Sequence, residues 1–173
     1  MKAMTLVELT ITLTIAIAFT AIAVPIFSES RRDAQMAAFA SEICGELTTA
    51  RLYAQMSGRS VSVNFDSQGP FLFQTRCGEI LLSSRKKQPP RADHYPRLQL
   101  PPQPITHPTS GQVLEAAFRS THGNRIVFGA RGSSSATLTF SMDDRRVLCI
   151  VVSGSTGRFR AYLLAEQNWV PFQ

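Results

Sequence analysis

The chain has 173 residues, 18 Lys and Arg against 12 Asp and Glu, a net charge of +6 and a sequence pI of about 9.8. Hydrophobic residues make up 44% of the chain and charged residues 17%, and this apolar content excludes disorder as a description of the whole protein. Residues 1–58 carry four basic and five acidic side chains, a net of −1, whereas residues 59–173 carry fourteen and seven, a net of +7, so an anionic partner is expected to bind the C-terminal two thirds.

The N-terminal segment is predicted to be a membrane helix. Leu9 to Ser28 contains no charged residue, and a helix that spans a bilayer needs about 20 residues. A cleaved secretory signal with Ala21 and Ala23 at its cleavage site is the alternative, although the apolar core of such a signal is usually only about 7 to 15 residues long. Pro25 removes one helical hydrogen bond and predicts a kink. Glu8, at the edge of the apolar run, indicates either a charged partner or a position among the lipid headgroups.

The residues around Glu8 have a recognisable pattern. The sequence Ala3-Met4-Thr5-Leu6-Val7-Glu8-Leu9, followed by an apolar helix with Pro25 near its end, resembles the class III signal of type IV pilins and pseudopilins. The resemblance implies that a prepilin peptidase removes the leader, residues 1–3, and that the new N-terminus at Met4 is methylated. It also implies that Glu8 and Pro25 act in filament assembly. In this chain Ala3 stands where the family normally has Gly before the cleaved bond.

A filament gives a physical reason for Glu8. When apolar helices bundle, a buried carboxylate needs a positive partner, and the free N-terminal amine of a neighbouring subunit can supply one. Any other stagger of the helices would leave a charge unpaired in an apolar surrounding. Glu8 is therefore expected to fix the register of assembly.

The helix is predicted to continue beyond the membrane. Apolar residues spaced by three and four form one face of an amphipathic helix over residues 29–58, and Gly58 is a stop signal. That face consists of Met36, Phe39, Ile43, Leu47, Ala50 and Ala54. The predicted organisation is thus a leader (1–3), a transmembrane and filament-core helix (4–28), an amphipathic stalk helix (29–58) and a β-rich head (59–173).

The head is predicted to be mostly β-structure. Alternating apolar residues and intervening turn residues indicate strands at 61–65, 71–73, 79–82, 126–128, 137–140, 146–153 and 159–164. Residues 83–112 hold seven of the ten prolines and the basic residues Arg85, Lys86 and Lys87, and are predicted to form a long loop before a short helix at 113–118. The run 147–152 is apolar throughout, which predicts a central strand buried on both faces. The expected fold class is α+β, a long N-terminal helix packed on an antiparallel β-sheet head, as in pilins.

The C-terminal third carries a second resemblance. The pattern F-G-x-x-G-S-x-x-x-T-L-x-F from Phe128, then Thr156-Gly157-Arg158-Phe159-Arg160, is similar to the GspH/FimT family of minor pseudopilins and pilins. The motif Gly157-Arg158-Phe159-Arg160 fits the Gly-Arg-x-Arg motif that in FimT-like minor pilins is associated with binding DNA during natural transformation.

The alternation of a strand supports this interpretation of the motif. Residues two apart share a face, so Arg158 and Arg160 are expected to point the same way while Phe159 enters the core. Two guanidinium groups side by side can hold consecutive phosphates. The residues expected to widen this basic surface are Arg145, Arg146 and the cluster Arg85, Lys86 and Lys87. The alternative is that Gly157 turns a hairpin and the arginines only solubilise the outer face.

Neither a metal site nor a catalytic site is expected. The three cysteines form no CxxC pair and no His stands at ligand spacing, so zinc and other cofactors are not predicted. In an oxidising periplasm, Cys77 and Cys149 are candidates for a disulfide, whereas Cys44 on the helix is expected to be a buried free thiol. The His, Asp and Ser residues show no catalytic arrangement, which argues against an enzyme.

The sequence therefore predicts a minor pilin-like subunit of a type IV pilus-type filament. It would act in pilus assembly or priming and would bind double-stranded DNA for uptake. Expected partners are other pilin or pseudopilin subunits, the prepilin peptidase and the bacterial inner membrane, with the head in the periplasm. One alternative is an H-type minor pseudopilin of the type II secretion system, acting in protein export. Another is a membrane-tethered periplasmic enzyme or a secreted protein with a cleaved signal.

Overall fold

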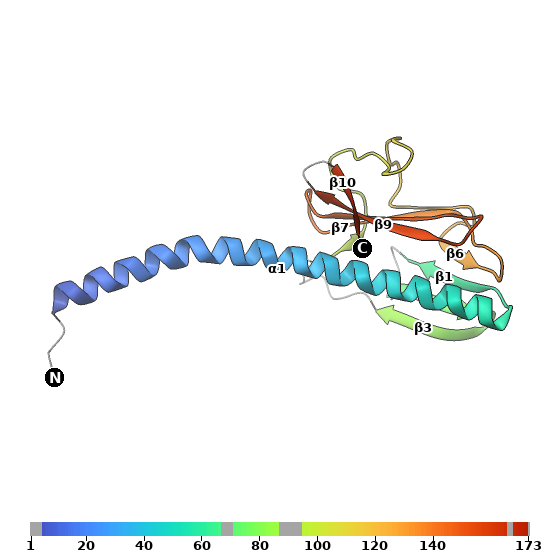
Figure 1. The fold of residues 1–173 in the computed structure, drawn as a ribbon, viewed down its shortest axis with the longest axis horizontal. Coiled ribbons are helices and arrows are strands. Elements are labelled where there is room, and N and C mark those ends of the chain that lie inside the picture. The colour runs from blue at the N-terminus through green and yellow to red at the C-terminus, as the bar shows by residue number, and fades with distance from the viewer. Residues whose placement is uncertain (1–4, 67–70, 87–94, 166–167, 173) are drawn as a thin grey trace. The chain divides into compact units, whose positions relative to one another are not determined.

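The computed structural model describes residues 5–66, 71–86, 95–165 and 168–172. In this part the chain forms one helix, α1 (Leu6–Ser57), and ten β-strands, all paired antiparallel. The chain divides into two compact units, residues 1–35 and residues 36–173, and we call the second unit the head. The α+β fold class, with a long N-terminal helix and antiparallel sheets, is confirmed (Figure 1).

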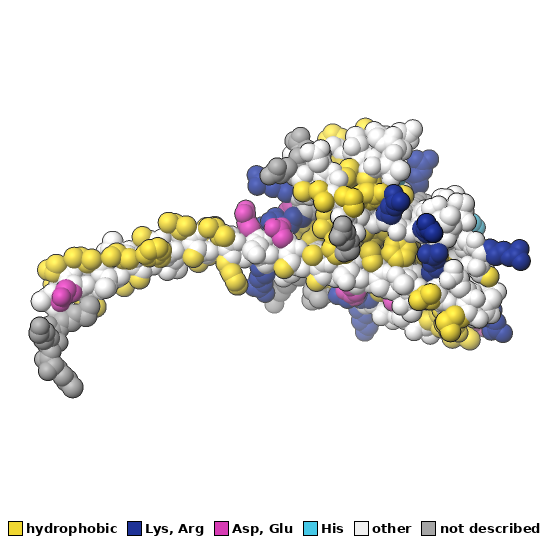
Figure 2. All heavy atoms as spheres, viewed as in Figure 1, with side chains coloured by type: hydrophobic (Ala, Val, Ile, Leu, Met, Phe, Trp, Pro, Cys, Tyr) yellow, Lys and Arg dark blue, Asp and Glu magenta, His cyan; other side chains and the backbone are white. Residues whose placement is uncertain are grey.

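In the first unit α1 is apolar and exposed. Its most apolar 18 residues have a mean hydropathy of 2.2, and Figure 2 shows hydrophobic side chains along this part of the helix. The helix is thus long and apolar enough to cross a membrane, and it continues through Pro25. Hydroxyl groups in this stretch donate to backbone carbonyl oxygens three or four residues earlier, which satisfies them without water; they belong to Thr10, Thr12, Thr14 and Thr20.

In the head, one face of α1 is buried. The buried side chains are Met36, Phe39, Ala40, Ile43, Leu47, Ala50 and Ala54. All six positions of the predicted apolar face are among them, so the helical spacing of the sequence is confirmed. Gly58 follows with a φ of +66°, the left-handed conformation that ends a helix at little cost when the residue is glycine.

The first sheet has the strand order β3-β2-β1-β6. Its strands are β1 (Val61–Phe65), β2 (Phe71–Cys77), β3 (Ile80–Lys86) and β6 (Arg125–Phe128). Val61, Val63 and Phe65 are buried while the residues between them are half-buried, the alternation of a strand with one face on a core. The turn between β2 and β3 contains Gly78 at a φ of +61°.

The second sheet has the order β10-β9-β8-β7-β4, and β5 also pairs with β7. Its strands are β4 (Arg97–Leu98), β5 (Phe118–Ser120), β7 (Ala136–Ser141), β8 (Val147–Val152), β9 (Phe159–Ala165) and β10 (Asn168–Phe172). We call the face that packs toward α1 the inner face and the opposite one the outer face. Leu148, Ile150 and Val152 of β8 belong to the core on the inner face.

The core lies where α1 and the two sheets meet. Phe39 of α1 and Phe65 of β1 both contact Phe140 of β7, with ring centroids 5.0 and 6.2 Å apart. Edge-to-face aromatic pairs of this kind add roughly 0.5 to 1.5 kcal/mol beyond the burial of their area. One phenylalanine cluster therefore joins the helix to both sheets.

Two carboxylates of α1 bind the first sheet to the helix. Glu42 forms an ion pair with Arg85 of β3, and Glu46, one turn later, accepts hydrogen bonds from the hydroxyls of Thr75 and Ser83. Glu42 and Glu46 are only half-buried, so these contacts orient the sheet beside the apolar core rather than replace it.

The second sheet is covered on its outer face by residues 99–117. The Trp169 indole N–H of β10 donates to the Thr106 carbonyl oxygen at 2.7 Å, and His107 bonds to the Thr137 hydroxyl of β7 at 3.2 Å. Because these anchors lie on opposite sides of β8 and β9, the segment lies over both strands. This explains the predicted double burial of β8, whose residues Val147 to Ile150 are fully buried.

Several predicted element boundaries are wrong. The expected helix at 113–118 is extended chain, because Val113 bridges to Thr106 and the Ala117 carbonyl oxygen accepts from the Thr139 N–H. The first residues of the expected loop at 83–112 belong to β3, and the loop also contains β4. Its residues 87–94 lie outside the described residues. β5 and β10 were not predicted, since both are short and β10 contains Pro171, which is typical of an edge strand.

The proposed disulfide between Cys77 and Cys149 is also wrong, because all three cysteines are free. Cys77 ends β2 and belongs to the core between α1 and the sheets, whereas Cys149 lies on β8 opposite Thr139 and Tyr162, on the outer face of the other sheet. The second sheet therefore separates the two thiols. Burial raises the pKa of Cys149 to about 12, and burial also raises that of Cys44, so both remain protonated at neutral pH.

Candidate functional site

The N-terminal signature forms a local hydrogen-bonded structure. The Thr5 N–H donates to the Glu8 carboxylate at 2.9 Å, and the Glu8 N–H donates back to the Thr5 hydroxyl at 3.3 Å. This reciprocal pair is a capping box, which satisfies two free donors where a helix begins. The Thr-x-x-Glu spacing therefore has a structural role that sequence analysis missed. Ala3 and Met4 lie outside the described residues, whereas Pro25 lies within α1.

The Gly-Arg-x-Arg motif begins in the turn between β8 and β9. Gly157 has a φ of +63°, a left-handed conformation that only glycine adopts without strain. Its N–H donates to the Ser153 carbonyl oxygen at 2.9 Å, and the Ser153 N–H donates to the Arg158 carbonyl oxygen at 2.8 Å. The turn is thus closed by hydrogen bonds on both sides of Arg158.

The turn at residues 129–135 holds the β8–β9 turn in place. The Ser133 N–H donates to the Gly154 carbonyl oxygen at 2.9 Å, and a Cβ atom added to Gly132 would lie 2.9 Å from that same oxygen. The Gly154 N–H in turn donates to the Ser135 hydroxyl at 3.2 Å. Such close backbone approach leaves no room for a side chain at Gly132 or Gly154, and it makes the paired turns a rigid support.

The helix contributes an arginine to this support. The Arg51 guanidinium of α1 donates to the Thr156 carbonyl oxygen at 3.3 Å. Its Nε lies 3.5 Å from the position that a Cβ of Gly157 would take. Arg51 therefore brings a third positive charge to the motif. Sequence analysis missed it because the two segments are about a hundred residues apart and only the fold brings them together.

Arg158 and Arg160 are both exposed, while Phe159 between them packs against the core. Arg160 pairs with Val151 of β8, which places it on the outer face. The alternation expected for this strand is therefore present. In the described part of the chain neither arginine has an acidic partner, so their charges are available to a ligand.

The other basic candidates lie elsewhere. Arg145 and Arg146 follow β7 in the turn before β8, at the opposite end of β8 from Gly157. Arg146 forms an ion pair with Asp143 at 2.7 Å. Burial alone would raise the pKa of the Asp143 carboxyl, but its hydrogen bonds to Arg146 and the Arg145 backbone and the Arg146 charge together lower it. The Arg146 charge is thus largely compensated.

The cluster on β3 is likewise separate from the motif. Arg85 pairs with Glu42 and donates to the Tyr95 hydroxyl at 2.6 Å. Glu42 marks the place of Arg85 on α1, and Arg51 marks the place of the Gly-Arg-x-Arg turn. The two helix residues are nine positions apart, or about 13 Å along the helix axis. Lys86 is exposed beside Arg85, and Lys87 lies outside the described residues. The structure therefore does not join the predicted basic residues into one patch.

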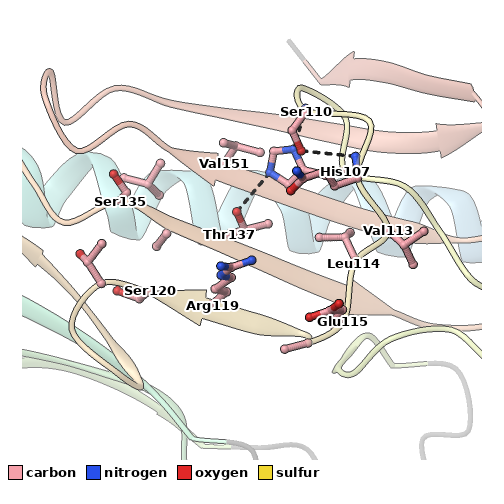
Figure 3. Close-up of a pocket in the computed structure, with 15 residues that line it drawn as sticks. His107, Ser110, Val113, Leu114, Glu115, Arg119, Ser120, Ser135, Thr137 and Val151 are labelled. Carbon is pink, nitrogen blue, oxygen red and sulfur yellow. Dashed lines mark hydrogen bonds between the residues drawn. The ribbon is translucent and has the colours of Figure 1, made fainter.

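A groove of about 860 Å³ lies on the outer face of the second sheet. Figure 3 shows its floor, formed by Arg119 of β5, Thr137 of β7 and Val151 of β8, with His107 and Ser110 on the wall. The groove continues to Ser135, the residue that bonds to the Gly154 turn. It therefore adjoins the support of the Gly-Arg-x-Arg motif.

His107 fixes the wall of this groove. Its Nδ1 accepts hydrogen bonds from the N–H groups of Thr109 at 3.2 Å and Ser110 at 3.1 Å. The ring proton of the neutral imidazole must then be on Nε2, which donates to the Thr137 hydroxyl. Burial lowers the pKa of His107, and a protonated Nδ1 could not accept these bonds. The neutral ring is the one that holds the segment in place.

Among the described residues, no group of three or more His, Cys, Asp or Glu side chains is placed to hold a metal ion.

The sequence matches the protein family described as type II transport protein GspH over residues 40–156. The matched span covers the buried part of α1 from Ala40 and the strands β1 to β8, and it ends at Thr156, just before the Gly-Arg-x-Arg motif. No curated protein and no solved structure matches the chain.

The neutral state of His107 makes stability depend on pH. Because its pKa is lower in the folded than in the unfolded protein, the unfolded state binds more protons, and the free energy of unfolding should decrease as pH falls below about 6.5. Above that pH the contribution is complete. Denaturant titrations followed by the fluorescence of the single Trp, Trp169, would measure this. The decrease should be smaller in His107→Gln, and an unchanged pH profile in this variant would contradict the assignment.

Proposed function

Since the chain belongs to the family of the type II transport protein GspH, we propose that it acts in the assembly or priming of a type IV pilus-type filament and that its head binds DNA. Members of the family are structural, pseudopilin-like subunits rather than enzymes and associate with other such subunits. The family and the one long apolar helix among the described residues fit a membrane-anchored subunit of an envelope filament. The observation that carries the DNA proposal is the presentation of Arg158 and Arg160 on the rigid pair of turns.

The assembly proposal concerns the N-terminus. A prepilin peptidase removes residues 1–3 and Met4 becomes the methylated N-terminus, with α1 held in the inner membrane and the head in the periplasm. Along α1 the first basic residue after Glu8 is Arg31, about 34 Å away at the rise of a helix. Glu8 thus finds no cation nearby on its own helix. The terminal amine of a neighbouring subunit would neutralise it inside a filament.

Replacing Glu8 should separate assembly from folding. Glu8→Gln keeps an oxygen that can accept from the Thr5 N–H but removes the charge, so the helix should still form while incorporation into filaments is lost. Sheared filaments and membrane fractions, compared by immunoblotting, would measure this. The control is Glu29→Gln, on the same helix. Normal incorporation of the Glu8 variant would exclude the charge pairing.

The DNA proposal rests on geometry and charge at the β8–β9 turn. Arg158 and Arg160 lie on one face, about 7 Å apart along an extended strand, and Arg51 adds positive charge behind the turn. Guanidinium groups bind phosphates through charge-assisted hydrogen bonds, which carry no base sequence information. Binding should therefore be independent of sequence and should weaken steeply with salt.

Removing both arginines should weaken DNA binding. For Arg158→Ala with Arg160→Ala we expect a loss of about tenfold at low salt, as for two exposed contacts of about 0.7 kcal/mol each. Retardation of a labelled duplex by the full-length protein in neutral detergent would measure it. The matched control is Lys86→Ala with Arg145→Ala, which removes the same charge at positions remote from the turn. Equal effects of the two pairs would show that total charge, rather than the motif, governs binding.

The alternative function is that of an H-type minor pseudopilin of the type II secretion system. The observation that favours it is the description of the matched family, a type II transport protein. In that case the basic head and residues 99–117 would face other minor subunits or an exported protein. The same rigid turns would then present Arg158 and Arg160 to acidic side chains instead of phosphates.

A deletion strain distinguishes the two functions. If the pilus proposal holds, transformation by added DNA should fall by an order of magnitude or more while the export of secreted proteins is unchanged; a plasmid-borne copy should restore uptake. The opposite result, with export lost and uptake retained, would reject the pilus function and support the secretion alternative.

A further inference from the structure

Strand register places a third exposed arginine in line with the motif. Arg119 pairs with Thr137, Thr137 pairs with Val151, and Val151 pairs with Arg160. These four residues form one row across β5, β7, β8 and β9. Both ends of the row are arginines, and the two residues between them form part of the groove floor.

The two arginines differ in their surroundings. Arg160 stands on an open strand beside the turn, whereas Arg119 lies in the groove, with the hydroxyls of Ser120, Ser135 and Thr137 among the groove-lining groups (Figure 3). Glu115 also lines the groove, but no ion pair joins it to Arg119 among the described residues. The Arg119 charge is thus available to an anion, and nearby hydroxyls offer further hydrogen bonds to phosphate oxygens.

The distance between the row's ends limits what can bind both. Neighbouring strands are about 4.8 Å apart, so three steps put the Cα atoms of Arg119 and Arg160 about 14 to 15 Å apart. This is twice the separation of Arg158 and Arg160, which suits consecutive phosphates of one strand. The major groove of duplex DNA is about 12 Å wide, and arginine side chains at the two ends can therefore reach the two backbones that border it.

We propose that Arg119 is a second phosphate anchor, which binds one strand of duplex DNA while Arg158 and Arg160 bind the other strand across the major groove. The inference rests on the proposed DNA binding and deepens it by naming the form of the ligand. Residues 107–116 form the far wall of the groove and limit how far the duplex extends over the sheet. A single strand, which follows one backbone, engages Arg158 and Arg160 alone.

The test compares duplex and single-stranded DNA. Full-length protein in neutral detergent is titrated with a labelled duplex and with one of its separated strands, from about 50 to 200 mM salt. For Arg119→Gln we expect duplex affinity to fall roughly fivefold, equivalent to about 1 kcal/mol, and the slope of log K against log salt to become shallower by about 0.9. Single-strand affinity should remain within twofold of the unsubstituted protein. Arg119→Lys should recover most of the duplex affinity.

The control is Arg76→Gln, which removes the same charge from the first sheet. Unchanged duplex binding by Arg119→Gln, or an equal loss for both forms of DNA, overturns the inference. If Arg158→Ala with Arg160→Ala still weakens binding in the same assay, the proposed function survives that outcome. If neither Arg119→Gln nor the double variant weakens DNA binding, the inference and the proposed DNA-binding function are both rejected. Competition by polyglutamate as strong as that by duplex of equal charge would also overturn the inference, because the groove would then accept any acidic polymer.

Discussion

The buried stripe of α1, from Met36 to Ala54, is the surface on which both sheets depend. Each sheet has an apolar inner face that must leave water, and a single helix supplies the covering surface for both. The phenylalanine cluster of Phe39, Phe65 and Phe140 lies at the junction of the three elements. For this reason the head needs the last six turns of α1, residues 36–57, as part of its core.

The second sheet needs covering on both faces, and this requirement explains residues 99–117. β8 is apolar at every position, so the inner face alone could not bury it. The crossing segment, anchored at Trp169 and His107, covers the outer face. It does not extend over the whole sheet, and the uncovered part beside β5 and β7 becomes the groove. The groove is therefore a consequence of how the sheet is covered.

Charge has two different uses in the head. Arg85 and Arg146 have acidic partners and serve the fold. Arg158, Arg160 and Arg119 have none among the described residues and lie on the outer side of the second sheet or at its turn. The net charge of residues 59–173, +7 by sequence, thus overstates what a ligand would meet, and the part that is available is concentrated around one turn and one groove. This distribution favours a localised anionic ligand over general attraction to the head.

The sequence alone determined the features that depend on local periodicity: the apolar span, the buried face of α1, the doubly buried β8 and the alternation of Arg158, Phe159 and Arg160. It also identified the family, because each of the two signatures, at residues 3–9 and at residues 128–160, is a local pattern in the chain. Only the tertiary structure decided which distant residues meet. It showed that Cys77 and Cys149 lie in different sheets, and that residues 113–118 are extended because they bond to β7 and to Thr106. It also showed that Arg51 contacts the turn of the motif and that Arg119 shares a row of paired residues with Arg160. Hydrophobic spacing specifies which face of an element is buried, whereas the partners across a sheet follow from register and packing, which no local pattern encodes.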